Sequence, residues 1–193
     1  DGTKYWSPDC TYSFYAVYPH SVDSNCTENG TITIDGFDAS TTGEGAIDLM
    51  TSKKVISVEY NKGDTPSSVQ IPMVHELARV KFTVKNAGKA AKVNFNKFKI
   101  NGVHYSGDFS KVPSKDEYGT WSSLLTTVKD DGKFSAPSFE ITTGENAEKN
   151  VFGDMLMIPV ADLANAEIEY SYSCDDGEER SAIIPIKTSS VSA

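Results

Sequence analysis

The chain has 193 residues, of which 38% are hydrophobic and 23% are charged. This composition is typical of globular domains, and the length permits one large domain or two small ones. The formal net charge of −9 opposes both the phosphate backbone of nucleic acids and anionic lipid surfaces, which argues against partners of either kind. No run approaches the roughly 20 apolar residues that cross a bilayer, so we expect the mature chain not to span a membrane.

Alternating apolar and polar residues, separated by turn sequences, predict an all-β fold with short helices only. Turn sequences such as Asp35-Gly36, Asn101-Gly102 and Asp131-Gly132 occur at a spacing that favours a β-sandwich. Residues 44–53 and 161–165 have helical signals for a turn or two each. The expected strands cover residues 11–18, 31–35, 55–60, 69–74, 78–85, 93–101, 139–142, 154–160, 166–174 and 179–187.

The clearest strand covers residues 166–174, where apolar and polar side chains alternate with a period of two. Asp175-Asp176-Gly177 follows it and predicts a hairpin into residues 179–187. In the strand at 93–101 the apolar residues change phase, which predicts a bulge near Asn96 or Lys97. Small and polar residues at 86–92 interrupt the pattern, so we divide the chain near residue 88 into two β-domains, residues 1–88 and 89–193.

The three cysteines, at positions 10, 26 and 174, have no spacing typical of zinc or thioredoxin sites. A disulfide between Cys10 and Cys26 would close a loop of about 15 residues and contribute about 3 kcal/mol, if the compartment is oxidising. Cys174 falls on the apolar face of its expected strand, where a buried and unreactive thiol is common.

No catalytic motif emerges from the sequence. His75-Glu76 begins like a zinc protease helix, but Arg79 stands where the second histidine is needed and the flanking residues alternate as in a strand. The other histidines are scattered, and neither a nucleophile elbow nor a phosphate loop is present. We therefore expect no enzyme, cofactor or metal site. A pair of glycosidase carboxylates stays open, because their separation is a property of the folded chain.

Three segments, in this order, resemble those of a known family. They are Tyr5-Trp6-Ser7-Pro8 with the run FYAVYP at 14–19, the segment HELARVKFTV at 75–84, and the segment MLMIP at 155–159 followed by IEY at 168–170. Together they resemble the signature of the Bacteroidales fimbrillin-like (Mfa-like) family, whose members are type V pilus subunits. The resemblance covers most of the chain.

The resemblance implies two transthyretin-like Greek-key β-sandwich domains. It also implies export through a lipoprotein precursor anchored at the outer membrane, and a place in a cell-surface fimbria that mediates adhesion. Assembly in this family proceeds by strand exchange with other pilus subunits, after proteolysis removes an N-terminal strand. A sandwich without an edge strand presents unpaired backbone groups and an apolar groove, which a strand from another subunit can fill.

The candidate donor strand lies at residues 181–191, where Ala182, Ile184 and Ile186 alternate with other residues. The alternative is that these side chains close their own hairpin. Seven basic and no acidic residues occur at 79–99, and they form either a patch that aligns subunits through complementary charge or a solvated strand face that blocks edge aggregation.

An alternative function is a cell-surface glycan-binding β-sandwich module, with a host glycan or protein as partner. Aromatic rings in loops can stack on sugar faces. The candidate stacking residues lie in or near expected loops, and the alternative to glycan binding is that they plug the ends of the sandwiches. They are Trp6, Tyr105, Tyr118 and Trp121, with Tyr5 beside them.

Overall fold

The computed structural model describes residues 5–65, 67–129, 131–143, 148–161 and 163–186. In these residues the chain forms β-strands and one short 3-10 helix, which confirms the all-β class. No helix in this part of the chain is long and apolar enough to span a bilayer. The elements are β1 (Cys10–Phe14), β2 (Val17–Tyr18), β3 (Asn25–Cys26), β4 (Ile32–Asp38), η1 (Gly43–Gly45), β5 (Met50–Ser52), β6 (Ile56–Tyr60), β7 (Met73–His75), β8 (Ala78–Val80), β9 (Thr83–Lys85), β10 (Lys92–Asn101), β11 (His104–Lys111), β12 (Thr120–Thr126), β13 (Ser135–Ala136), β14 (Phe139–Thr142), β15 (Glu148–Asn150), β16 (Met155–Met157), β17 (Glu167–Cys174) and β18 (Arg180–Pro185).

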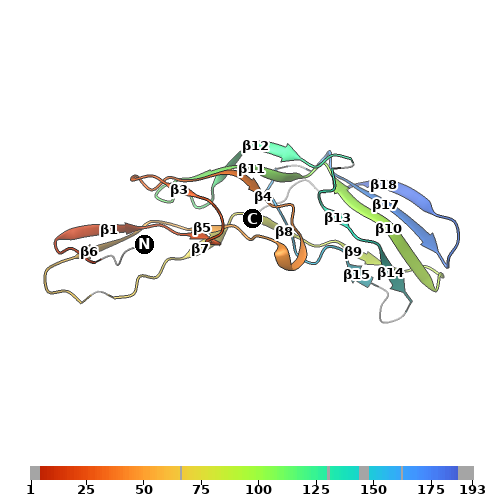
Figure 1. Cartoon of the computed structure of the whole chain (residues 1–193), viewed down its shortest axis with the longest axis horizontal. Helices are drawn as coiled ribbons and strands as arrows, with labels where there is room; N and C mark the ends of the chain where they lie inside the picture. Colours follow the sequence, from red (N-terminus) through yellow and green to blue (C-terminus); the bar gives the residue numbers. More distant parts are fainter. Residues whose placement is uncertain (1–4, 66, 130, 144–147, 162, 187–193) are drawn as a thin grey trace.

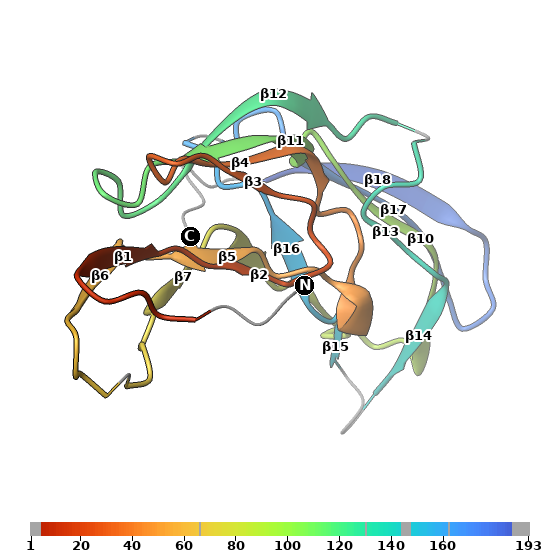
Figure 2. The same ribbon diagram turned by 60° about the vertical axis from the view of Figure 1, so that its left-hand side comes forward.

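Two layers of strands form the first sandwich. One layer has the order β12-β11-β4-β3, and the other has the order β2-β5-β7. Figure 2 shows the first of these layers above the second, and Figure 1 shows the β1-β6 ribbon extending as an arm at one end of the molecule. Ile32, Ile34 and Phe37 of β4 point into the core between the layers, where they meet Leu49 and Phe109. Alternation places Ile32 and Ile34 on one face, and an irregularity in the register between Ile34 and Phe37 brings Phe37 to the same core.

The second sandwich lies at the opposite end of the molecule from the arm (Figure 1). Its large sheet has the order β13-β10-β17-β18, with β14 also paired to β10, and two small pairs, β15-β9 and β16-β8, supply side chains to the same core. The core is rich in aromatic rings. Phe95 stacks on Phe139 at 4.8 Å between centroids, and Phe98 meets Phe152 edge to face.

The two cores share a wall, because β16 is buried on both faces. Leu156 packs in the first core, whereas Met155 and Met157 pack in the second. β11 and β12 return from the second half of the chain to pair beside β4 in the first sandwich. The division expected at residue 88 therefore does not coincide with the boundary between the cores.

Several expected elements differ from those observed. Residues 44–53 form η1 and then the strand β5 rather than a helix, and residues 164–165 form only a turn. The strand expected at 69–74 is limited to β7. Six strands were not expected, namely β3, β5, β11, β12, β13 and β15.

The bulge and the last hairpin are confirmed. The register of β10 against β17 shifts between Phe95 and Lys97. β17 pairs with β18 along its length, and the N–H of Gly177 donates to the carbonyl of Cys174 at 2.8 Å. The positive φ angles of this turn belong to Asp175 and Asp176, at 47° and 60°, rather than to Gly177. This is the pattern of a type I′ turn.

A buried ion pair joins the two layers of the first sandwich. Lys111 Nζ lies 2.8 Å from Glu76 Oε1, and the two side chains are 0% and 1% exposed. The ammonium also donates to the hydroxyl of Thr51 at 2.9 Å, and that hydroxyl donates to Glu76 at 2.6 Å. The N–H of Gly119 donates to Glu76 Oε2 at 2.9 Å. The buried charges are thus paired and hydrogen-bonded.

We expect Lys111→Ala or Glu76→Ala to lower the free energy of unfolding by about 3–5 kcal/mol, because each leaves an unpaired charge in the core. Urea denaturation measures this change. Lys85→Ala, in the exposed pair with Glu148, is the control and should leave the stability almost unchanged. Single variants of the buried pair that behave like this control would contradict the prediction.

A second lysine, Lys99, is nearly buried, and its ion pair makes the stability of the fold depend on pH. Its Nζ lies 2.8 Å from Asp131 Oδ1. Burial raises the pKa of Asp131, but hydrogen bonds from Lys99 and from the N–H groups of Val128 and Lys133 outweigh it, so the pKa lies below the ordinary aspartate value. A lowered folded-state pKa gives stability that is present above the unfolded-state pKa and is lost as the pH falls through the folded-state pKa.

We therefore expect Asp131→Asn to be destabilising at neutral pH, and the difference from the wild type to shrink as the medium is acidified below the ordinary aspartate range. Urea denaturation midpoints of both proteins, measured across this pH range, give the difference in stability. Asp35→Asn, at an exposed position of β4, is the matched control. A stability difference between Asp131→Asn and the wild type that stays constant with pH would refute the assignment of the pH dependence to Asp131.

Candidate functional site

One side of the first sandwich is open. In the described residues β2 pairs only with β5, and β1 pairs only with β6. On the facing layer the edge strand β3 pairs only with Ile32 and Thr33 of β4. Residues 34–38 of β4 therefore have no strand partner on the side away from β11. β1, β2 and this part of β4 thus each have a free strand edge, and such edges are templates for pairing with another strand.

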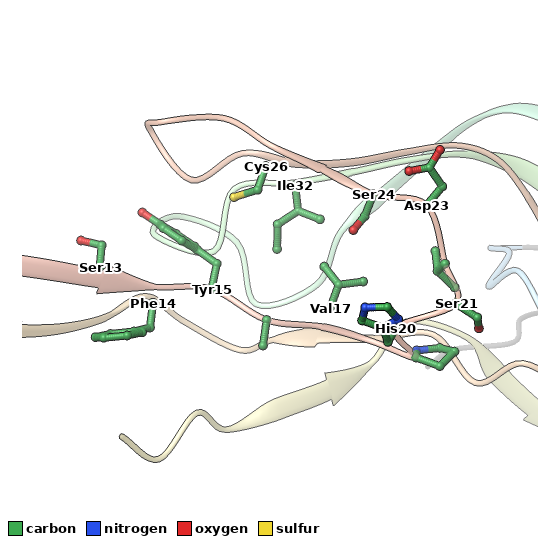
Figure 3. Close-up of a pocket in the computed structure, with 13 residues that line it drawn as sticks. Ser13, Phe14, Tyr15, Val17, His20, Ser21, Asp23, Ser24, Cys26 and Ile32 are labelled. Atoms are coloured by element: carbon green, nitrogen blue, oxygen red, sulfur yellow. The ribbon is translucent and has the colours of Figure 1, made fainter. Parts of the chain in front are cut away.

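A groove lies between the β1-β2 segment and the start of β4, and residues 34–38 of β4 do not line it. It has a volume of about 750 Å³ and is lined by residues 13–17, 19–24, 26 and 32, which we call the lateral groove. Figure 3 shows that Val17 and Ile32 approach its middle from the two layers, with Cys26 beside Ile32. His20, Asp23 and other polar residues lie toward one end. The groove offers an apolar centre and a polar rim.

The run FYAVYP forms the wall of the lateral groove because it is bent and anchored between β1 and β2. The N–H of Ser52 donates to the carbonyl of Ala16 at 2.9 Å, and the N–H of Ala16 donates to the hydroxyl of Ser52 at 3.3 Å. After the cis bond between Tyr18 and Pro19, the N–H of Val22 donates to the Pro19 carbonyl at 3.1 Å. The chain then crosses to the other layer.

The cysteines are free and exposed, so the disulfide expected between Cys10 and Cys26 is not formed in this structure. Cys10 lies on β1 and Cys26 on β3, which belong to different sheets. Burial against the groove wall raises the pKa of the Cys26 thiol. Cys174, expected to be buried, is exposed because it is the last residue of β17.

The candidate donor residues lie in the second sandwich. β18 is the edge strand of its sheet and pairs with β17, so these residues do close their own hairpin. Ile184 is 46% exposed and lines a second groove of about 420 Å³, whereas Ile186 packs against the core. Ala182 is half-buried opposite Tyr170. Donation to another subunit would require β18 to leave this hairpin.

Most of the basic residues at 79–99 have acidic partners from elsewhere in the chain. Arg79 pairs with Asp154, and Lys85 pairs with Glu148. Further ion pairs join Lys92 to Glu140 and Asp176, Lys97 to Glu169, and Lys99 to Asp131. Local ion pairs therefore balance this segment, which favours a paired strand face over an unbalanced basic patch.

The structure does not bring the candidate stacking residues together. Trp6 packs against Tyr12 of the β1-β6 ribbon, at 4.7 Å between centroids. Trp121 packs edge to face on Phe109 in the first core. Tyr105 packs on the second core, with Lys133 Nζ 4.8 Å from its ring centroid, and Tyr118 and Tyr5 are exposed.

His75 and Glu76, which begin like a zinc protease helix in the sequence, have other roles in the structure. His75 Nδ1 lies 2.7 Å from Asp48 Oδ2, and Glu76 belongs to the buried ion pair. No group of three or more histidine, cysteine or acidic side chains that could hold a metal occurs in the part of the chain that the structure describes.

Comparisons with known proteins agree with this architecture. A crystal structure of a candidate cell adhesion protein from Bacteroides uniformis matches with a TM-score of 0.52 and 16% identity, over 93% of this chain and 62% of that protein. At this identity the likeness shows the fold alone, and the chain spans less than two thirds of that protein's length. The comparison with curated proteins gave no match. The family model described as fimbrillin-like matches residues 1–189. The chain therefore belongs to the fimbrillin-like family.

Proposed function

We propose that this chain is a structural subunit of a bacterial surface fimbria that assembles by strand donation, with the lateral groove as acceptor. The observation that carries the proposal is the lateral groove beside β1 and β2, each of which has one strand partner and one free edge in the described residues. Membership of the fimbrillin-like family supports it. So does the fold shared with a candidate cell adhesion protein.

A donated strand suits this groove for two physical reasons. Its backbone would pair with a free edge, which satisfies N–H and C=O groups that otherwise face water. Its alternate side chains would cover Val17 and Ile32, which line the middle of the groove. The backbone would supply affinity and the side chains would supply specificity.

We propose residues 181–191 as the donor, released from the β17-β18 hairpin. β18 has only one strand partner in the described residues, and Ile183 and Ile184 are 57% and 46% exposed. An edge strand with exposed apolar side chains is a ready source of a strand for another chain. Residues 187–191 lie outside the described residues, so the argument rests on residues 181–186.

The rest of the proposal follows from the family. Export through a lipoprotein precursor anchored at the outer membrane would bring the subunit to the cell surface, and proteolytic removal of an N-terminal strand would open the groove. Other pilus subunits are then the main partners, and the chain acts as a scaffold without catalysis. The glycan-binding alternative has weaker support, because Trp6, Tyr105 and Trp121 pack against different neighbours.

Cys26 provides a built-in reporter for this proposal, because it lines the lateral groove while Cys10 and Cys174 do not. Its raised pKa leaves less thiolate at mildly alkaline pH, so the alkylation rate of Cys26 in the free subunit is measured first as the baseline. We expect a synthetic peptide of residues 181–191, at saturation, to slow alkylation of Cys26 by about a further tenfold. Alkylation of Cys10 and Cys174 should not change. Mass spectrometry of the alkylated protein measures all three rates.

The matched control is the same peptide with aspartate in place of Ile184 and Ile186, which should not protect Cys26. Equal protection by both peptides would point to nonspecific adhesion. No protection by the native peptide would exclude residues 181–191 as the donor for this groove. Two results together would favour the glycan-binding alternative. The protein would bind a polysaccharide and lose that binding in Trp6→Ala, and the peptide would leave Cys26 unprotected.

A further inference from the structure

The core of the first sandwich holds an amine and a carboxylate in contact, away from solvent. Lys111 Nζ lies 2.8 Å from Glu76 Oε1, and the two side chains are 0% and 1% exposed. The end of β11 supplies the lysine, and the segment between β7 and β8 supplies the glutamate. An amine and a carboxylate are the two reactants of an amide bond.

A buried hydroxyl group bridges these two reactants. The hydroxyl of Thr51 accepts a hydrogen bond from Lys111 Nζ at 2.9 Å and donates one to Glu76 Oε1 at 2.6 Å. The nitrogen, the hydroxyl and the carboxylate oxygen form a closed triangle, because Nζ also donates directly to Oε1. A hydroxyl in this position can accept a proton from the nitrogen while it gives its own proton to the oxygen.

The second oxygen of the carboxylate has a backbone donor. The N–H of Gly119 donates to Glu76 Oε2 at 2.9 Å. When an amine attacks a carboxyl carbon, one of the two oxygens becomes negatively charged, and an N–H group held at this distance stabilises that charge. Glu76 therefore has a proton donor on one oxygen and a donor for a developing oxyanion on the other.

Burial favours an amide over an ion pair at this position. Two charges in a dry core have lost their hydration, and their mutual attraction offsets this loss only in part. An amide is neutral, and the water molecule that its formation releases can leave to the solvent. Contact between the reactants also favours the reaction, because well-oriented groups within one molecule reach effective concentrations of about 10⁵ M or higher.

We propose that Lys111 and Glu76 condense to an intramolecular amide bond in the folded chain, with the Thr51 hydroxyl as proton relay. One proton passes from Nζ to Oε1, and the neutral amine attacks Cδ of Glu76. A bond forms between Nζ and Cδ, and Oε2 carries the negative charge beside the Gly119 N–H. Thr51 then passes a second proton from the nitrogen to Oε1, the bond between Cδ and Oε1 breaks, and one water molecule leaves.

This modification goes beyond the proposed function and does not depend on the lateral groove. Its formation consumes no oxidant, reductant or cofactor, so the folded chain is sufficient. The bond ties the end of β11 to the segment that crosses between the two cores. It restricts the unfolded chain between residues 76 and 111 in the way that a disulfide does.

Mass spectrometry of the purified, folded protein at successive times after expression tests the proposal. We expect the intact protein to become lighter than its sequence requires by the mass of one water molecule. Trypsin should then release residues 63–79 and 100–115 as one branched peptide. The amide joins these two segments, and it also blocks cleavage after Lys111 because the lysine is no longer charged.

Variants of Thr51 test the proton relay. Thr51→Val removes the hydroxyl and keeps the shape of the side chain, so it should slow formation of the branched peptide about a hundredfold. Thr51→Ser keeps a hydroxyl and should form the bond. Thermal unfolding of each variant verifies that it is folded.

The pair of Lys99 and Asp131 is an internal control in the same digest. Lys99 Nζ lies 2.8 Å from Asp131 Oδ1, and its side chain is 3% exposed. In the described residues no hydroxyl group bridges this pair, and Lys99 donates instead to the carbonyl of Val128 at 2.7 Å. We therefore expect no branched peptide between Lys99 and Asp131.

Several results would overturn the proposal. A folded protein that keeps the full mass of its sequence at every time would refute the amide bond. Loss of water without the branched peptide would place the modification elsewhere and would refute it as well. A bond that forms equally fast in Thr51→Val and in the wild type, or a second bond between Lys99 and Asp131, would refute the role of the hydroxyl relay.

Discussion

The first sandwich depends on the buried ion pair between Lys111 and Glu76. Lys111 ends β11, an inner strand of one layer, and Thr51 belongs to β5, the middle strand of the other. Glu76 lies between β7 and β8, where the chain passes from the first core to the second. The network thus joins the centres of both layers to each other and to the segment that crosses between the cores. Because the layers are joined at their middle strands, their lateral edges can stay unpaired without the sandwich separating.

Much of the fold could be predicted from the sequence, because many strands have regular local patterns. The alternation at 166–174 is complete, so β17 and its type I′ turn follow from local chemistry alone. The bulge at Asn96 could be predicted because the apolar phase changes there. The family could be predicted because its segments are short runs with distinctive residues, and the run at 14–19 also forms the wall of the lateral groove.

The rest depends on contacts between distant parts of the chain. β11 was missed because Gly107 and two register shifts against β12 break its alternation. Lys111 looks like a surface residue in sequence, and its buried partners Glu76 and Thr51 lie far away along the chain. The groove could not be predicted either. It lies between two layers that are distant in sequence, and no local pattern reveals that residues 13–24 face Cys26 and Ile32.

An open side also has a cost, since free strand edges with apolar side chains promote aggregation. Several features of the lateral groove limit this cost. Pro19 ends the exposed edge of β2, and His20 and Asp23 place polar groups at one end. The Tyr15 ring packs against Gly30 and so connects the two layers beside the groove. The unpaired edge beside the middle of the groove is thus the short edge of β2 around Val17, since Ile32 pairs with β3. A short opening weakens nonspecific pairing more than specific pairing, because a matched strand gains both backbone hydrogen bonds and a fitted register. In the proposed assembly, the same features that protect the subunit alone would also determine which strand can enter.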